Sequence, residues 1–349
     1  MIRNKPRDAA VYGVDLGKNV FHVVGLDASG QPIQKAKFRR ETLLQFFGQA
    51  KPALVGMEAC PGSQWLARKI SALGHSVRIL PAQFVKPYVK SNKNDTIDAE
   101  AIAEAVTRPT MRFVEIKSID QADMQALHRI RDQMMGSRTR LICQIRAFCL
   151  EYGIAIRQGV STFKLDLPRI LSDNDNELTS RMRRLLSDLY DDFERLEKRI
   201  ASVTGEIKDT ADQDEMAKRL MTVPGIGPLV ASALRAAAGN AQQFLKARDL
   251  AAWLGLVPRQ YSTGGKQKLL GISKRGNSYV RRLLIHGARS CAMRLDPEKD
   301  RLGQWIRQLG QRMPTNKVIV ALAAKIARVA WVIMNRPGSL YDKRQPGLS

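Results

Sequence analysis

Four carboxylates in the first third of the chain have the residue types and spacing of a divalent-metal site. Asp15 lies near the end of the apolar stretch "AVYGVDLG", and Glu58 ends the apolar stretch "ALVGME". Asp95 and Asp98 stand three residues apart in "KNDTIDAEAIA", where a helical pattern begins, so they share one face of that helix. Because a buried carboxylate is costly unless it is paired or bound to a metal, the pattern predicts a shared site.

Each acid also has a simpler interpretation. Asp15 can cap the glycine turn that follows it, and Asp95 and Asp98 suit a helix N-terminus, where the helix dipole favours negative charge. Two parallel strands, however, would present Asp15 and Glu58 side by side, at the strand ends where ligands gather in open α/β sheets. Four such charges repel one another unless a cation lies between them.

The expected cation is Mg²⁺, with Mn²⁺ as a substitute. Hard divalent ions prefer oxygen ligands, and two ions about 3.5–4 Å apart would suit phosphoryl transfer. No histidine lies near these acids in the sequence, which argues against zinc. The sequence leaves open which of Asp95 and Asp98 binds metal directly and which binds through water.

The elements around these acids predict a mixed α/β sheet. Residues 10–39 contain three consecutive strand patterns, followed by a helix in "ETLLQFFGQA" and then by alternating strands and helices. No GxGxxG follows the first strand, which excludes a dinucleotide-binding fold. The sequence predicts an α/β domain over residues 1–117.

The rest of the chain is predicted to be mostly helical. We expect a helical spacer over 118–215, a C-terminal domain over 216–335 and a disordered tail over 336–349. Within the spacer, apolar residues at alternating spacings of four and three indicate a coiled coil or an antiparallel helical pair; the alternative is a helix packed on its own domain. The seam consists of Met182, Leu186, Leu189, Phe193, Leu196, Ile200 and Val203.

Composition indicates a polyanionic partner. The 349 residues carry a net charge of +24 with a pI near 10.3, which favours nucleic acid first and an anionic membrane surface second. Residues 218–349 hold 24 Lys and Arg against 5 Asp and Glu, a net +19, which leaves +5 for the remainder. The four cysteines lack metal-site spacing, so we expect buried thiols in a reducing cytoplasm. No secretory signal or 18-residue apolar run is found, so no membrane partner is expected.

Several residues are candidates for contact with phosphates. "PGIGP" places Gly225 and Gly227 between two helical patterns, as in a helix-hairpin-helix; the alternative is an ordinary glycine turn. If about six phosphates were neutralised on duplex DNA, the log–log salt slope would be about −5. We expect Ser262 to lie in a loop. The candidate cations are Lys93, beside the acids, and Lys266, Lys268, Lys274, Arg275, Arg281 and Arg282, around that loop.

These motifs resemble a known family. The order Asp15, Glu58, Asp95, Asp98 resembles the DEDD set of RuvC-like, RNase H-type nuclease domains, and "KNDTIDAEAIA" resembles the DEDD transposases of the IS one-ten family, which includes the Piv and MooV DNA invertases. "RQYSTGGKQKLLGISKRGNSYVRRLLIHGAR" is similar to the C-terminal transposase domain of that family, especially its eleven-eleven subgroup. The resemblance covers roughly 10–115 and 218–295.

The resemblance implies a DNA recombinase of a prokaryotic insertion sequence, located in the cytoplasm or nucleoid. It implies a serine nucleophile that matches Ser262, with Ser273 as the competing candidate, and a covalent phosphoserine link to DNA. It also implies a noncoding bridge RNA that pairs with donor and target DNA, and we expect a homodimer or tetramer. Two other classes stay open. One is a metal-dependent, Holliday-junction-type endonuclease that uses water, and the other is a non-catalytic nucleic-acid-binding protein.

Overall fold

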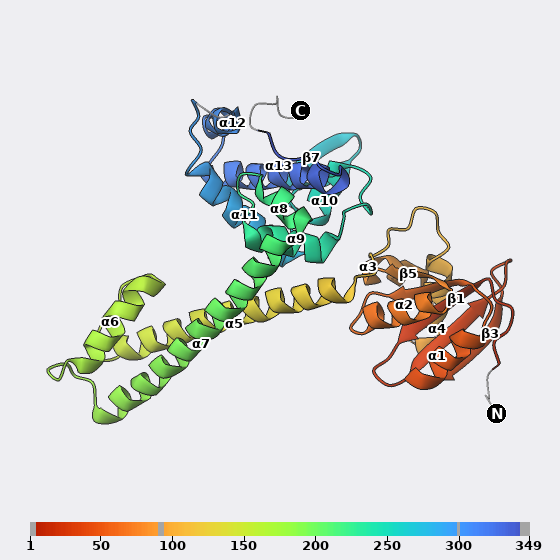
Figure 1. Cartoon of the computed structure of the whole chain (residues 1–349), viewed down its shortest axis with the longest axis horizontal. Helices are drawn as coiled ribbons and strands as arrows, with labels where there is room; N and C mark the ends of the chain where they lie inside the picture. Colours follow the sequence, from red (N-terminus) through yellow and green to blue (C-terminus); the bar gives the residue numbers. More distant parts are fainter. Residues whose placement is uncertain (1–4, 90–93, 299–300, 343–349) are drawn as a thin grey trace. The chain divides into compact units, whose positions relative to one another are not determined.

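The computed structural model describes residues 5–89, 94–298 and 301–342. The chain forms two compact units, Met1–Ser118 and Ile119–Ser349 (Figure 1). Each unit has its own hydrophobic core, and each is considered by itself below.

The first unit is built on a five-stranded mixed sheet, as the sequence predicts. Its strand order is β3-β2-β1-β4-β5. Neighbours β1–β2 and β2–β3 pair antiparallel, whereas β1–β4 and β4–β5 pair parallel. The strands are β1 (Val11–Leu16), β2 (Phe21–Leu26), β3 (Pro32–Phe38), β4 (Leu54–Glu58) and β5 (Ser76–Leu80).

Helices cover both faces of this sheet. On one face, α1 (Arg40–Gln49) and α2 (Ser63–Ala72) bury a core that includes Tyr12, Phe46 and Phe47 in edge-to-face contact. On the other face, α4 (Asp95–Ala105) packs against β1, β2 and β4. Short α3 (Ala82–Val85) and the 3₁₀ turn η1 (Lys86–Tyr88) lead from β5 toward α4.

Two strand glycines let α4 lie directly on the sheet. A Cβ atom on Gly13 of β1 would stand 2.0 Å from the carbonyl oxygen of Ala99 in α4. A Cβ atom on Gly56 of β4 would stand 2.8 Å from the Cβ of Val106. Because larger residues at these positions would push the helix away, the two glycines fix the height at which the first turn of α4 lies above the strands.

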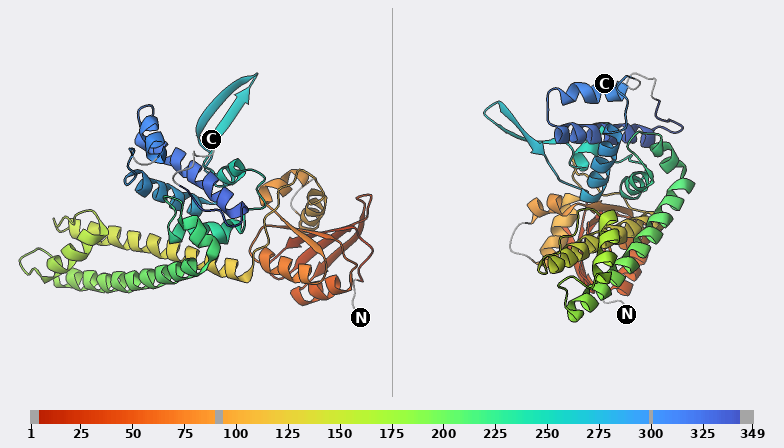
Figure 2. Two further views of the ribbon diagram at one scale, coloured as in Figure 1. Left: turned by 45° about the horizontal axis from the view of Figure 1, so that its top comes forward. Right: turned by 90° about the vertical axis from the view of Figure 1, so that its left-hand side faces the viewer.

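A long antiparallel helical pair opens the second unit. Helix α5 (Ile119–Leu150) runs beside α7 (Ser180–Gln213), and Arg138 bonds Glu197 at 2.9 Å while Arg131 bonds Thr204 at 2.8 Å (Figures 1 and 2). The predicted seam is used within this chain, since Leu186 and Phe193 are buried in a core shared with α5 and α6 (Val160–Ser172). Of the two predicted arrangements, the structure contains the antiparallel pair.

A second core gathers the remaining helices. Helix α13 lies at its centre and alone among the described helices is long and apolar enough to cross a membrane. Half of its apolar window is buried, and it packs against α10 and α11, so it is a core helix here. The helices are α8 (Glu215–Met221), α9 (Pro228–Ala238), α10 (Ala247–Trp253), α11 (Ser278–Ala292), α12 (Arg301–Gly310) and α13 (Thr315–Asn335).

A β-hairpin interrupts this helical body. Strands β6 (Pro258–Thr263) and β7 (Lys266–Ile272) pair antiparallel around a two-residue turn, and the hairpin stands out from the helices in Figure 2. Gly264 and Gly265 have φ of 54° and 76°, and such left-handed pairs match the twist of a hairpin. The sequence predicts a serine-containing loop here, so the two strands are a correction to that expectation.

Two smaller predictions are also corrected. Cys149 and Cys291 are buried thiols as expected and Cys60 is partly buried, but Cys143 is exposed because it lies on the solvent side of α5. The tail is not disordered as far as Asp342. Arg219 donates to the carbonyl of Ser339 at 3.1 Å, and the amide of Tyr341 donates to the hydroxyl of Thr222 at 2.9 Å.

Candidate functional site

Two of the four acids end neighbouring parallel strands. The register pairs Val14 of β1 with Met57 of β4, and Asp15 and Glu58 each follow one residue later. Because side chains alternate along a strand, Asp15 faces the same side as Gly13, toward α4. The first turn of α4 contains Asp95 and Asp98. The fold therefore gathers all four carboxylates at one end of the sheet.

The electrostatics of Asp15 confirm this proximity. Burial raises the pKa of the Asp15 carboxyl above its ordinary value, and the negative charges of Asp98, Asp95 and Glu58 raise it further. His22 acts in the opposite direction. Mutual repulsion of this kind suits a bound divalent cation, and carboxylate oxygens are suitable ligands for Mg²⁺. Within residues 5–89, 94–298 and 301–342, however, no three His, Cys, Asp or Glu side chains are close enough to hold a metal ion.

Asp95 and Asp98 both lie in the first turn of α4, so the simpler interpretation, favourable negative charge at a helix N-terminus, also holds, although neither residue is the N-cap. Asn94 is the N-cap of α4, and its side-chain oxygen accepts a hydrogen bond from the amide of Thr96 at 2.9 Å. Asp95 is exposed and Asp98 is partly buried, so both carboxylates are open to a further ligand. Lys93, predicted to approach a phosphate, lies outside the described residues.

His22 is a member of this cluster that sequence reasoning missed. Its Nδ1 atom lies 3.6 Å from Oδ2 of Asp95, and its side chain is only 16% exposed. The β1–β2 register places it opposite Asp15. The argument against zinc from the lack of a histidine near the acids in sequence therefore loses its basis, because the fold brings His22 to them. The sequence could have shown this pair. If "GKNV" is read as the turn between two antiparallel strands, counting one residue outward from Leu16 and Phe21 pairs Asp15 with His22.

The two candidate serines occupy different surroundings. Ser262 lies on the exposed strand β6, opposite Gln267, and its hydroxyl accepts a hydrogen bond from the side chain of Gln260 at 2.8 Å. Ser273 lies in the loop after β7, where its amide donates to the carbonyl of Val257 at 2.8 Å. The Ser273 hydroxyl accepts from the amide of Arg275 at 3.5 Å, so it forms part of the loop.

The six cations near Ser262 divide into two groups. Arg281 donates to the backbone carbonyls of Leu254 and Arg275, and Arg282 forms a surface ion pair with Asp132, so both have partners within the unit. The other four are exposed, and no described carboxylate pairs with them. They are Lys266, Lys268, Lys274 and Arg275.

The loop that carries two of these cations is held rigidly. Lys274 has a φ of 54°, and its amide donates to the carbonyl of Gly255 at 3.1 Å. A Cβ on Gly276 would stand 1.8 Å from the carbonyl oxygen of Trp253. The loop therefore presents Lys274 and Arg275 to solvent in a fixed arrangement.

The two predicted helix-hairpin-helix glycines also differ. Gly225 has a φ of 90° and lies against α11, where a Cβ on Gly287 would stand 2.0 Å from its carbonyl oxygen. Gly225 thus has a packing role. Gly227 is the exposed N-cap of α9, and a Cβ there would meet nothing within 4 Å, so Gly227 is the glycine with room for a ligand.

An α/β unit with carboxylates gathered at one end of its sheet, joined in one chain to a strongly basic helical region, defines a class of proteins suited to a polyanionic substrate. Comparison with known families narrows this class. The model described as "Transposase IS116/IS110/IS902 family" matches residues 217–304, and a DEDD transposase model of the IS110 type matches residues 12–154.

Similar proteins cover almost the whole chain. The transposase for insertion sequence element IS1328 of Yersinia enterocolitica is 43% identical over 337 residues, 96% of this chain and 99% of the relative. The transposase for IS1111A of Coxiella burnetii is 41% identical, over 96% of this chain and 92% of the relative. A pilin gene-inverting protein of Moraxella bovis is 25% identical, over 81% and 80%. The chain belongs to the IS110 family of insertion-sequence transposases.

Proposed function

We propose that this transposase cuts and rejoins DNA strands through a metal-assisted serine nucleophile and takes its target sequence from a bound noncoding RNA. The observation that carries the proposal is the gathering of Asp15, Glu58, Asp95 and Asp98 at one end of the first unit's sheet. Membership of the family supports action on DNA.

The four carboxylates are the residues proposed to hold Mg²⁺. When bound, the metal stabilises charge on the phosphate and favours ionisation of an attacking hydroxyl. The chemistry of the donor set suits this ion, because carboxylate oxygens repel one another without a cation. Binding requires these described side chains to come closer together than they lie here. His22 lies beside this donor set, with its Nδ1 atom 3.6 Å from Oδ2 of Asp95.

Ser262 is the proposed nucleophile. Its oxygen forms a bond to a DNA phosphorus while the bond from that phosphorus to one strand oxygen breaks; the serine proton is released, and the leaving oxygen takes up a proton. The phosphoserine link keeps the bond energy, so strands can be rejoined without ATP. Ser262 is favoured over Ser273 because Ser262 is exposed on a hairpin, whereas Ser273 is partly buried in its loop.

The exposed cations around Ser262 are proposed to bind the nucleic-acid backbone. Lys266, Lys268, Lys274 and Arg275 present charge without sequence information, since phosphate contacts position a strand and do not read its bases. Delegating sequence recognition to a bridge RNA, which pairs with donor and target DNA, suits this surface. Recombination of two duplexes favours a dimer or tetramer.

Strand cutting by purified protein, with its co-purifying RNA, tests the metal site. We expect cutting to require Mg²⁺ and to fall by roughly 10³-fold or more in Asp15→Asn, a loss typical of removing a main electrostatic group. Asp27→Asn, an exposed acid in the β2–β3 turn, is the matched control and should keep activity. If the Asp15→Asn variant still cuts DNA, or if the wild type cuts DNA in a chelator, the proposed metal site is wrong. If the protein binds DNA but cuts it in no divalent metal, it is a non-catalytic DNA-binding protein.

A further inference from the structure

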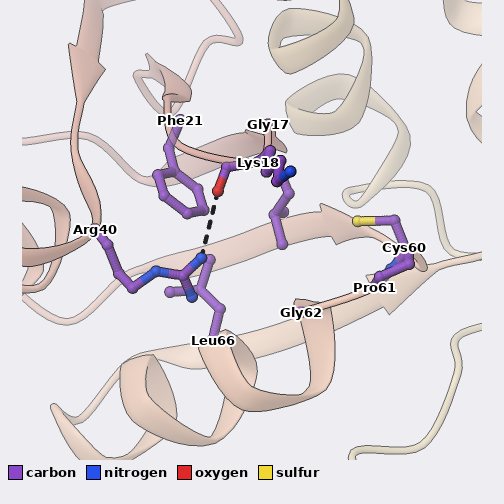
Figure 3. Close-up of a pocket in the computed structure, with 9 residues that line it drawn as sticks. Gly17, Lys18, Phe21, Arg40, Cys60, Pro61, Gly62 and Leu66 are labelled. Carbon is purple, nitrogen blue, oxygen red and sulfur yellow. Dashed lines mark hydrogen bonds between the residues drawn. The ribbon is translucent and has the colours of Figure 1, made fainter.

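A cavity lies at the same end of the sheet as the four acids, on the side covered by α1 and α2. Its volume is about 340 Å³, and none of the four acids lines it. Figure 3 shows Arg40, Lys18 and Cys60 around this space, from three different segments of the chain. The lining consists of Leu16, Gly17, Lys18, Phe21, Arg40, Cys60, Pro61, Gly62 and Leu66.

Arg40 is held over this cavity by two aromatic rings. Its guanidinium carbon lies 5.5 Å from the ring centroid of Phe21 and 5.0 Å from that of Trp65. Its Nη2 also approaches the carbonyl of Lys18 at 3.5 Å (Figure 3). Among the described residues, no carboxylate forms an ion pair with Arg40 or with Lys18. The cavity therefore has two cations beside it, one of them oriented in advance, and lacks an acidic partner for them.

The cavity adjoins the acids along two strands. Cys60 lines the cavity and follows Glu58 by two residues. Leu16 lines the cavity and directly follows Asp15 in β1. Because side chains alternate, Asp15 faces α4 while Leu16 faces the cavity. A nucleic-acid strand that crosses the ends of the strands would therefore pass the four acids and the cavity with successive phosphates.

We infer that this cavity binds a phosphodiester group of the DNA strand being cut, next to the phosphate that lies at the four acids. Arg40 and Lys18 neutralise that group, and the remaining space accommodates its sugar. A guanidinium offers paired donors to phosphate oxygens, which an isolated lysine cannot match. This inference rests on the proposed function and adds a strand-positioning subsite to it.

Cys60 gives a direct readout of occupancy. The full-length protein is alkylated at alkaline pH with and without a saturating short single-stranded DNA oligonucleotide, and the modification of each cysteine peptide is followed by mass spectrometry. We expect the alkylation rate at Cys60 to fall about tenfold when the subsite is nine-tenths occupied. Cys143, which is exposed on α5, is the internal control and should be affected little.

Variants separate this subsite from general DNA binding. In Arg40→Gln combined with Lys18→Gln, protection of Cys60 should fall below about twofold; in Lys69→Gln, an exposed cation at the other end of α2, protection should persist. Equal unprotected alkylation rates and melting temperatures will show that the variants fold. Unchanged protection in the double variant, no protection in the wild type, or protection by an RNA oligonucleotide alone would overturn the subsite.

Strand cutting, measured on the same variants, tests the proposed function separately from the subsite. Asp15→Asn should lose strand cutting and keep protection of Cys60, because the subsite does not use the carboxylate. If cutting is absent from the wild type but protection depends on Arg40, the subsite stands and the catalytic proposal fails. If cutting requires Asp15 but protection ignores Arg40, the subsite is wrong and the catalytic proposal stands.

Discussion

At the residue scale, the charge on Asp15 is a cost to the folded state. Its folded pKa is raised, so deprotonation favours the unfolded chain. Its contribution to stability is fully present below the unfolded pKa and is lost as pH rises through the folded pKa. Without metal at neutral pH, Asp15→Asn should therefore melt at a higher temperature than the wild type, by about 4 °C for each kcal/mol relieved in a unit of this size.

The ionised carboxylate of Asp27, in the same unit, stabilises the folded state, whereas that of Asp15 destabilises it. Hydrogen bonds from Ser29 and Gln31 lower the pKa of its carboxyl, so its ionised form stabilises the β2–β3 turn. Asp27→Asn should melt at a lower temperature than the wild type. Calorimetry of both variants in chelator checks the pair, and a fall in melting temperature for Asp15→Asn equal to that for Asp27→Asn would contradict the electrostatic account.

The sequence identifies the four acids as site residues, but it does not identify the residues that lie beside them in the fold. Asp15 and Glu58 are visible because each interrupts an apolar run at a strand end, which burial makes costly. His22 is missed because only strand pairing places it near the acids. Likewise, the residues around Arg281 in the sequence do not indicate that its guanidinium donates to the backbone carbonyls of Leu254 and Arg275.

At the element scale, the position of α4 depends on Gly13. A Cβ there would stand 2.0 Å from a backbone oxygen of α4, and backbone cannot move aside cheaply. Gly13→Ala should destabilise the first unit by about 1–3 kcal/mol, as overpacking does, and should displace Asp95 and Asp98. Urea unfolding measures the first effect. Gly48→Ala in α1 is the control, since its Cβ would meet only a side-chain atom at 4.0 Å; an equal loss there would contradict this account.

A buried histidine ties three helices of the second unit together. The ring of His128 in α5 bonds the hydroxyl of Tyr279 in α11 at 2.9 Å and that of Ser232 in α9 at 3.0 Å. Burial, and then the charge of Arg131, lower the pKa of His128 to about 4. The ring is therefore neutral in the folded protein at neutral pH.

This histidine predicts a loss of stability in acid. Because the folded pKa is lowered, the unfolded chain takes up the proton first, so the contribution is full above the unfolded pKa of about 6.5 and is lost as pH falls to about 4. The loss should be about 3 kcal/mol. Urea unfolding at several pH values should show a slope that flattens in His128→Gln and persists in His286→Gln, which alters an exposed histidine. An unchanged slope in His128→Gln would contradict this assignment.

Elements are predictable where burial leaves an apolar pattern. Strands β1 and β2 are buried on both faces and read as nearly continuous apolar runs, whereas α7 buries one face, so its apolar residues recur at the helix period. The hairpin β6–β7 buries almost nothing, and all six residues of β6 are exposed. Without a buried face it shows no alternation, and "STGGK" reads as a loop although its two glycines suit a hairpin turn.

At the scale of the whole molecule, charge asymmetry predicts salt-dependent binding. The sequence places six cations around Ser262, but in the structure Arg281 bonds backbone carbonyls and Arg282 pairs with Asp132. Four phosphate contacts on duplex DNA predict a log–log slope of about −3.6 from this surface. The double variant Lys266→Gln and Lys268→Gln should reduce the slope by roughly 2.

Fluorescence anisotropy over a range of salt concentrations measures this slope. Arg282→Gln is the matched control, because its guanidinium pairs with Asp132 and should alter the slope little. Loss of slope in Arg282→Gln with none in the double lysine variant would show that the hairpin does not contact phosphates.

Covalent trapping on DNA tests the central claim most directly. Protein purified with its RNA is incubated with donor and target DNA in Mg²⁺, denatured, and separated by size. We predict a protein–DNA adduct that survives denaturation, is absent in Ser262→Ala and is retained in Ser273→Ala. An adduct that persists in Ser262→Ala, or strand cutting there without any adduct, would contradict Ser262 as the nucleophile.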